Sequence, residues 1–106
     1  MKLFVIEENK IKLDINTVEY LVNGKERGKT ITRIRYLIAN LFNCNAYPNV
    51  DLFGIMRGAD SDHAELAVNI IEFMGLRYGD ACFMLINNLA PEIIENYKIK
   101  SPRDEN

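Results

Sequence analysis

The side chains with the richest chemistry in this chain stand together in the segment Asp60-Ser61-Asp62-His63. Two carboxylates and an imidazole within four positions could ligate a divalent metal. A metal site needs further ligands, however, and the chain has only 1 histidine. The segment also suits a helix start, because Asp62 and Glu65 have capping-box spacing and acidic groups stabilise the amino end of a helix. We therefore interpret it as a helix cap formed by Asp62 and predict no metal site.

A loop rich in glycine and lysine, GKERGKT, covers residues 24–30. It is similar to the phosphate-binding pattern GxxxxGK[ST], in which backbone N–H groups at a helix start cradle a phosphate. The similarity would require a strand before the loop, and only three residues separate its glycines instead of four. Because loop length sets the curvature of the cradle, we predict neither a nucleotide site nor any other cofactor.

The same loop and the helix after it carry a basic cluster. Such clustering is the main requirement for phosphate contacts, so a small nucleic-acid-binding regulator is the alternative interpretation of the chain. A sequence pI of about 5.4 and the thin aromatic content argue against nucleic acid as the main partner. The residues of this alternative site are Lys25, Arg27, Lys29, Arg33 and Arg35.

Acidic residues dominate the second part of the chain, although the net charge is only −2. Residues 38–106 contain ten Asp or Glu and five Lys or Arg, whereas residues 1–37 contain five and eight. An accessible acidic face would attract a basic protein and accelerate the encounter. Ordinary solubilising charges are the alternative. The residues predicted to bind a partner are Asp51, Asp60, Asp62, Glu65, Glu72 and Asp80.

No catalytic pattern accompanies these charges. The chain has no Trp. Its two cysteines, Cys44 and Cys82, lack CxxC spacing, so we interpret them as reduced core thiols of a cytosolic protein. The amino terminus lacks the apolar core of a signal peptide, and no apolar run is long enough to span a membrane. We therefore predict a non-enzymatic cytoplasmic binding protein. Its most concrete form is an immunity protein or inhibitor that covers the active site of a bacterial toxin, such as a nuclease, with the acidic face.

The elements that must position these residues form a single domain, predicted over residues 1–99 and followed by a loose polar tail over 100–106. The predicted class is α+β, with an amino-terminal β-hairpin packed against three to four helices. Lys2–Glu7 and Lys10–Ile15 are the expected strands, turning at Glu8-Asn9, and the first strand is expected to be buried on both faces.

Apolar spacing of three and four residues predicts a central helix over residues 30–43. Residues 16–24 are interpreted as a short helix capped by Asn16, with a strand over 18–22 as the alternative. Residues 50–56 are expected to be a short buried strand whose glycine allows close approach. The remaining expectations are a helix from Asp62 to Gly75, a buried helix or core strand over 81–89, and a last helix beginning at Pro91.

Overall fold

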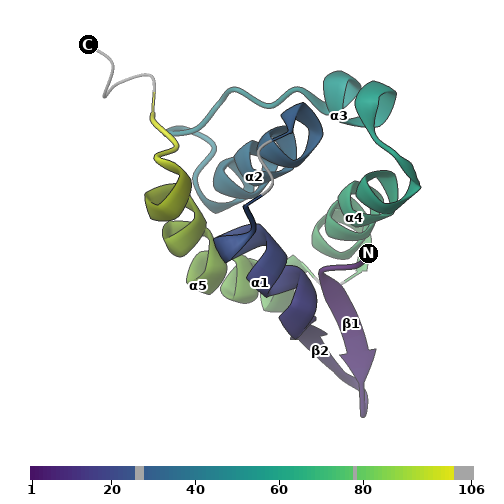
Figure 1. Ribbon diagram of the computed structural model, residues 1–106. Coiled ribbons are helices and arrows are strands. Elements are labelled where there is room, and N and C mark those ends of the chain that lie inside the picture. Colours follow the sequence, from purple (N-terminus) through teal and green to yellow (C-terminus); the bar gives the residue numbers. More distant parts are fainter. Residues whose placement is uncertain (26–27, 78, 102–106) are drawn as a thin grey trace.

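The computed structural model describes residues 1–25, 28–77 and 79–101. A two-stranded hairpin leads into helices that enclose one core (Figure 1), which confirms the predicted α+β class. The elements are β1 (Phe4–Glu7), β2 (Lys10–Leu13), α1 (Ile15–Asn23), α2 (Lys29–Phe42), α3 (Leu52–Gly58), α4 (Ser61–Glu72), the π-helical segment η1 (Phe73–Arg77) and α5 (Gly79–Tyr97).

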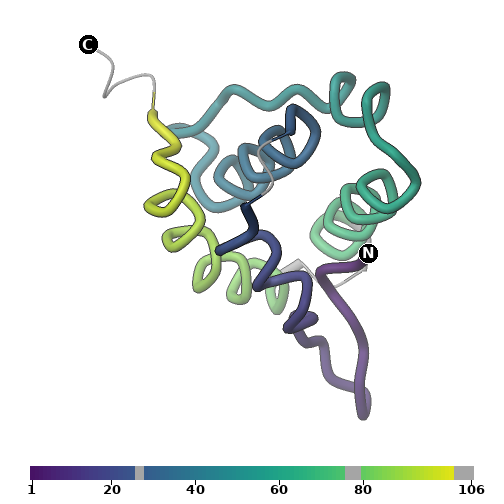
Figure 2. The backbone as a smooth tube through the Cα atoms, viewed as in Figure 1, coloured from purple at the N-terminus to yellow at the C-terminus, as the bar shows by residue number. Residues whose placement is uncertain are grey.

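The hairpin turns at Glu8 and Asn9, as predicted, and both residues have positive φ angles, of 52° and 64°. Two left-handed residues give the tight turn whose twist matches antiparallel strands. The expectation that the first strand is buried on both faces is wrong, because only Phe4 is buried and Ile6 is exposed. The tube in Figure 2 shows the reason: the end of the hairpin extends beyond the helices that could cover it.

The start of β1 is fixed to α4 by one buried side chain, Asn69. Its Oδ1 accepts from the backbone N–H groups of Leu3 and Phe4, at 2.9 and 2.8 Å, and its Nδ2 donates to the carbonyl of Phe4 at 3.0 Å. A strand edge buried without partners would be costly. The amide of Asn69 therefore replaces a third strand.

Residues 15–23 form helix α1, which confirms the helical interpretation and excludes the strand. The cap is Asp14 and not Asn16, because the Asp14 carboxylate accepts from the backbone N–H of Thr17 at 3.0 Å. Gly24 follows the last turn as expected. The buried side chains of α1 include Leu21 and Val22, which face the core.

The central helix α2 is confirmed, and it packs most extensively against α5. Its apolar residues at positions 31, 34, 37 and 38 are buried, as their spacing predicts. Arg35 lies among them with 2% of its surface exposed. The position of Arg35 was not expected, because the sequence pattern places it on the polar side of the helix.

The segment predicted as a buried strand over 50–56 is instead the start of helix α3, so that prediction is wrong. The Asp51 carboxylate accepts from the backbone N–H of Gly54 at 2.7 Å, which caps the helix and gives this short apolar run a helical start. Gly54 does allow close approach: an added Cβ would overlap the Asp51 side chain and lie 2.9 Å from the Arg33 guanidinium carbon.

Two helix ends also differ from the prediction. Gly75 does not end α4, because the chain continues directly into η1. Pro91 does not begin a separate helix but lies inside α5, on its exposed side. The carbonyl of Asn87, which loses its helical donor to a proline, belongs to an exposed residue and can be solvated. Ile99 and Ser101, beyond α5, are buried.

Candidate functional site

Three of the predicted acidic residues meet at the start of α4. Asp60, Asp62 and Glu65 are exposed there, and the Met1 amine lies 3.9 Å from Asp62 and 3.5 Å from Glu65. The cap is Asp60 and not Asp62: its carboxylate accepts from the backbone N–H of His63 at 2.8 Å. The prediction therefore placed the cap two residues too late. The Asp62 carboxylate does not cap the helix, and its side chain is 75% exposed.

The other three predicted acidic residues lie apart from this group. Asp51 is exposed at the opposite end of α3, where it forms an ion pair with Arg33 at 3.4 Å. Glu72, the last residue of α4, is roughly 16 Å along the helix from its start. Asp80 is exposed in the first turn of α5. The six residues thus do not form one continuous cluster.

Helix α3 adds a feature that the sequence reasoning missed. Phe53 is 73% exposed, and Leu52 and Met56 are each nearly half exposed. These three residues share one side of the helix, because positions three and four apart are neighbours. Ile55 points the other way and is fully buried. If Asp51 is taken as a helix cap, the helical spacing of the residues after it places these three side chains on one side, and this is the sequence signal that could have identified them.

A hydrogen-bonded chain lies beneath the acidic group. Asp60 Oδ1 is 2.9 Å from Nδ1 of His63, and Nε2 of the same ring is 3.0 Å from Oη of Tyr20 on α1. The backbone N–H of His63, with help from its ring, holds the pKa of Asp60 below the ordinary value. A carboxylate, an imidazole and a hydroxyl in this order can hold and transfer a proton. The imidazole is only 11% exposed, which leaves little room for a substrate.

The basic alternative site is divided by the fold. Lys25 and Lys29 are exposed, whereas Arg27 lies outside the described residues. Arg33 is half-buried and held by Asp51. The buried Arg35 donates to the carbonyls of Leu21 and Tyr20, at 3.0 and 3.1 Å, and stacks on the ring of Tyr97. Arg35 is therefore a structural cation and is not exposed for phosphate contact.

The structure does not provide the strand that a phosphate-binding loop requires before it. A helix, α1, and not a strand precedes the loop, and Gly28 caps α2 without a side-chain hydrogen bond. The Thr30 hydroxyl, which would touch a magnesium ion in such a loop, donates to the carbonyl of Gly58 at 3.2 Å. This part of the fold therefore joins α2 to α3.

The two cysteines differ. Cys82 is buried, as predicted, and burial raises the pKa of its thiol. Cys44 is exposed and is not a core thiol, because it follows the end of α2. In the described part of the chain, no three His, Cys, Asp or Glu side chains gather where they could hold a metal ion.

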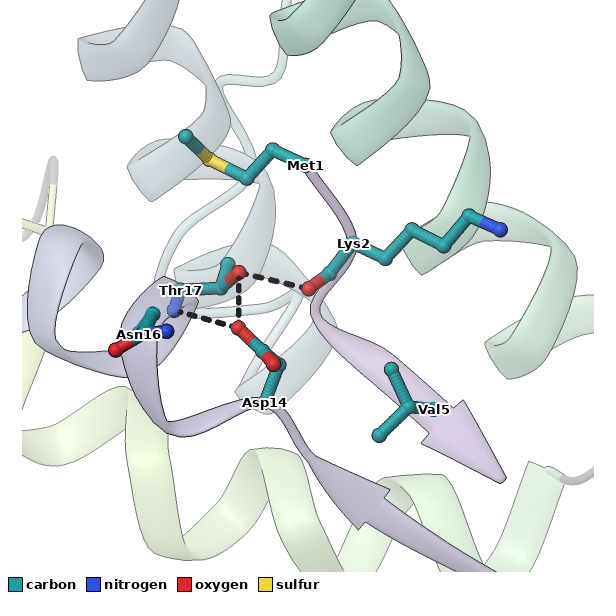
Figure 3. Close-up of a pocket in the computed structure, with 6 residues that line it drawn as sticks. All are labelled: Met1, Lys2, Val5, Asp14, Asn16 and Thr17. Carbon is teal, nitrogen blue, oxygen red and sulfur yellow. Dashed lines mark hydrogen bonds between the residues drawn. The ribbon is translucent and has the colours of Figure 1, made fainter. Parts of the chain in front are cut away.

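A hollow of about 410 Å³ lies between the start of β1 and the start of α1 (Figure 3). The Thr17 hydroxyl at its wall donates to the carbonyl of Lys2 at 2.7 Å and also lies 2.9 Å from the Asp14 carboxylate. These polar groups satisfy one another. These hydrogen bonds join the segment before β1 to the start of α1.

No family model matches the chain, and no curated protein or solved structure is similar enough to count as a match. Within residues 1–25, 28–77 and 79–101, no helix is both long and apolar enough to cross a bilayer. The site must therefore be interpreted from its own geometry. Its two main features are the apolar side of α3 and the acidic start of α4.

Proposed function

We propose that this protein acts by docking onto another protein through a surface that we name the α3–α4 surface. Exposed apolar side chains on a helix of only 7 residues are the observation that carries the proposal. Clustered exposed apolar groups mark interaction sites, and large aromatic side chains at their centre contribute most of the binding energy. The surface consists of Leu52, Phe53, Met56, Asp60, Asp62 and Glu65.

Charge favours a basic partner for the α3–α4 surface. Between residues 51 and 65 the chain carries four carboxylates and one arginine. Three of these carboxylates lie at the start of α4, whereas Asp51 is paired with Arg33 at the other end of α3. An apolar centre with a charged rim is the usual arrangement of a protein interface. Complementary charge would guide the partner into place.

A non-enzymatic inhibitor of a basic toxin is the most concrete form of this proposal. A bacterial nuclease must bind a polyanion, so its substrate groove is basic, and an acidic surface can cover that groove. Phe53 would insert into an apolar recess of the toxin, while the carboxylates would occupy positions that otherwise hold phosphates. We further propose a cytoplasmic location, which accords with the free thiol of Cys44 on the surface. A nucleic-acid partner is less favoured, because Arg35 is buried and Arg33 is ion-paired.

The proposal is tested by affinity capture from the native host with three baits: the wild-type chain, Phe53→Ala and Met84→Ala. Met84 is the matched control, because it is a large apolar side chain on α5 that is 69% exposed. We expect a stoichiometric basic protein on the wild type and on Met84→Ala. Truncating a central aromatic residue costs about 2 kcal/mol or more, or roughly thirtyfold in affinity, so Phe53→Ala should lose it.

Capture that is equal for both variants would contradict the α3–α4 surface. If this chain is an inhibitor, the activity of the captured protein must also respond to it. If that protein is a nuclease, an equimolar amount of the wild-type chain should abolish its activity. Continued nuclease activity in the stoichiometric complex would exclude inhibition by occlusion.

A further inference from the structure

His63 is the only histidine of the chain and occupies the third position of α4. Both of its ring nitrogens have partners from different places in the fold: Asp60 at the cap of the same helix, and Tyr20 on α1, 43 residues away in sequence. The imidazole is therefore a bridge between the acidic start of α4 and helix α1.

The partners determine which nitrogen carries the proton in the neutral ring. The Asp60 carboxylate, whose pKa is lowered, accepts hydrogen bonds but does not donate them. Nδ1 must therefore be protonated and donate to Asp60. Nε2 is then unprotonated and accepts from the Tyr20 hydroxyl. This arrangement satisfies both ring nitrogens without any charge on the imidazole.

We propose that His63 is a proton switch that couples α1 to the charge of the α3–α4 surface. When the ring gains a proton, Nε2 becomes a donor and the hydrogen bond with Tyr20 must reverse its direction. The new positive charge lies directly beneath Asp60, within the carboxylate group that also contains Asp62 and Glu65. Acidification therefore weakens the attraction of this surface for a basic partner. This consequence rests on the proposed function, whereas the reversal of the hydrogen bond does not.

The charged groups near the switch are few among the described residues. The Met1 amine contacts Asp62 and Glu65 from the start of the chain. On the neighbouring helices, Arg33 is held by Asp51, and the guanidinium of Arg57 lies 5.8 Å from the centre of the Phe53 ring. The imidazole itself is held by Asp60 and Tyr20, so these two residues determine how its protonation is transmitted.

A single histidine makes the switch directly observable by NMR, because the imidazole gives one set of ¹⁵N signals. At pH 8 we expect Nδ1 to be protonated and Nε2 to be unprotonated. Between pH 8 and pH 5, the backbone amides of α1 around Tyr20 should shift with the same midpoint as the imidazole. In Tyr20→Phe the imidazole should still titrate, but the response of α1 should be lost. In His63→Gln, the α1 amides should not respond in this interval.

Two results would overturn the switch: α1 amides that do not follow the imidazole, or a response that persists in His63→Gln. The effect on docking is measured separately with an oligolysine peptide as the probe. Its affinity should fall about two- to fivefold from pH 8 to pH 5 in the wild type, as expected for one added surface charge, and should fall measurably less in His63→Gln. Wild-type binding that does not change with pH would overturn the regulation. Absence of binding at both pH values would instead count against the acidic docking surface, while the NMR measurement still decides the switch.

Discussion

At the scale of single residues, polar side chains in the core join segments that are distant in the sequence. Asn69 completes the edge of β1, and Arg35 attaches the end of α1 to α2 through the carbonyls of Leu21 and Tyr20. Apolar periodicity identifies neither residue as buried, and it places Arg35 on the polar side of its helix. Their hydrogen-bond partners lie far away in the sequence and are set by tertiary structure.

Replacing Asn69 by Leu should destabilise the protein strongly. Leu has a similar volume but leaves the backbone N–H groups of Leu3 and Phe4 and the carbonyl of Phe4 without the Asn69 side chain as a partner. Each buried group left unsatisfied costs about 1–3 kcal/mol, so we expect a loss of at least about 3 kcal/mol in the free energy of unfolding, measured with urea. The control is Asn87→Leu on the exposed side of α5, which should change stability by less than about 0.5 kcal/mol. A loss below about 1 kcal/mol for Asn69→Leu would contradict the role of this amide.

Asp60 should contribute to stability in a pH-dependent way. Because folding lowers its pKa from 3.8, the folded state binds a proton less readily than the unfolded chain. The contribution is therefore fully present above about pH 4, and it is lost as the pH falls through 3.8 toward the lower folded value. Asp60→Asn keeps a capping side chain but cannot ionise in this range. The difference in urea midpoint between wild type and Asp60→Asn should shrink as the pH falls from 6 to 2, and a constant difference would refute this assignment.

At the scale of elements, amphipathic helices were predictable and short segments were not. The spacing in α2 predicts the buried apolar positions 31, 34, 37 and 38, although it misses Arg35, and α1 follows from its apolar positions and Gly24. The apolar run over residues 50–56 is too short for its hydrophobic periodicity to distinguish a strand from a helix. Side-chain caps decide such cases, and the sequence allows several choices within two or three residues. The caps at positions 14 and 60 were therefore each misplaced by two residues.

Gly54→Ala tests whether the Asp51 cap stabilises α3. Helix propensity alone predicts a gain in stability of up to about 1 kcal/mol. The structure predicts the opposite, because a Cβ at this position displaces the Asp51 carboxylate that caps the helix. We expect a loss of about 1 kcal/mol and faster amide hydrogen exchange in α3. Gly75→Ala is the matched control, since nothing lies within 4 Å of its added Cβ. Equal changes in the free energy of unfolding for Gly54→Ala and Gly75→Ala would show that the Asp51 cap does not stabilise α3.

At the scale of the whole molecule, the sequence predicted the class of the fold and one part of the candidate site. The uneven charge distribution indicated acidic residues, and three of them meet at the start of α4. The other three lie elsewhere, because Asp51 caps the start of α3, Glu72 ends α4 and Asp80 is in the first turn of α5. The apolar side of α3 was missed for a physical reason: a run such as Leu52–Met56 is expected to be buried, and only the assembled fold shows that three of its side chains, Leu52, Phe53 and Met56, are exposed.

The most direct test of the docking account is the dissociation constant of the captured partner, measured by calorimetry for two charge-matched variants. Asp62→Lys/Glu65→Lys reverses two charges on the α3–α4 surface, and Glu92→Lys/Glu95→Lys reverses two exposed charges on α5. We predict that the first variant binds about tenfold or more weakly, and that the second stays within about twofold of the wild type. Equal weakening by both variants would show that only net charge matters. Unchanged binding by the first variant would contradict the docking surface itself.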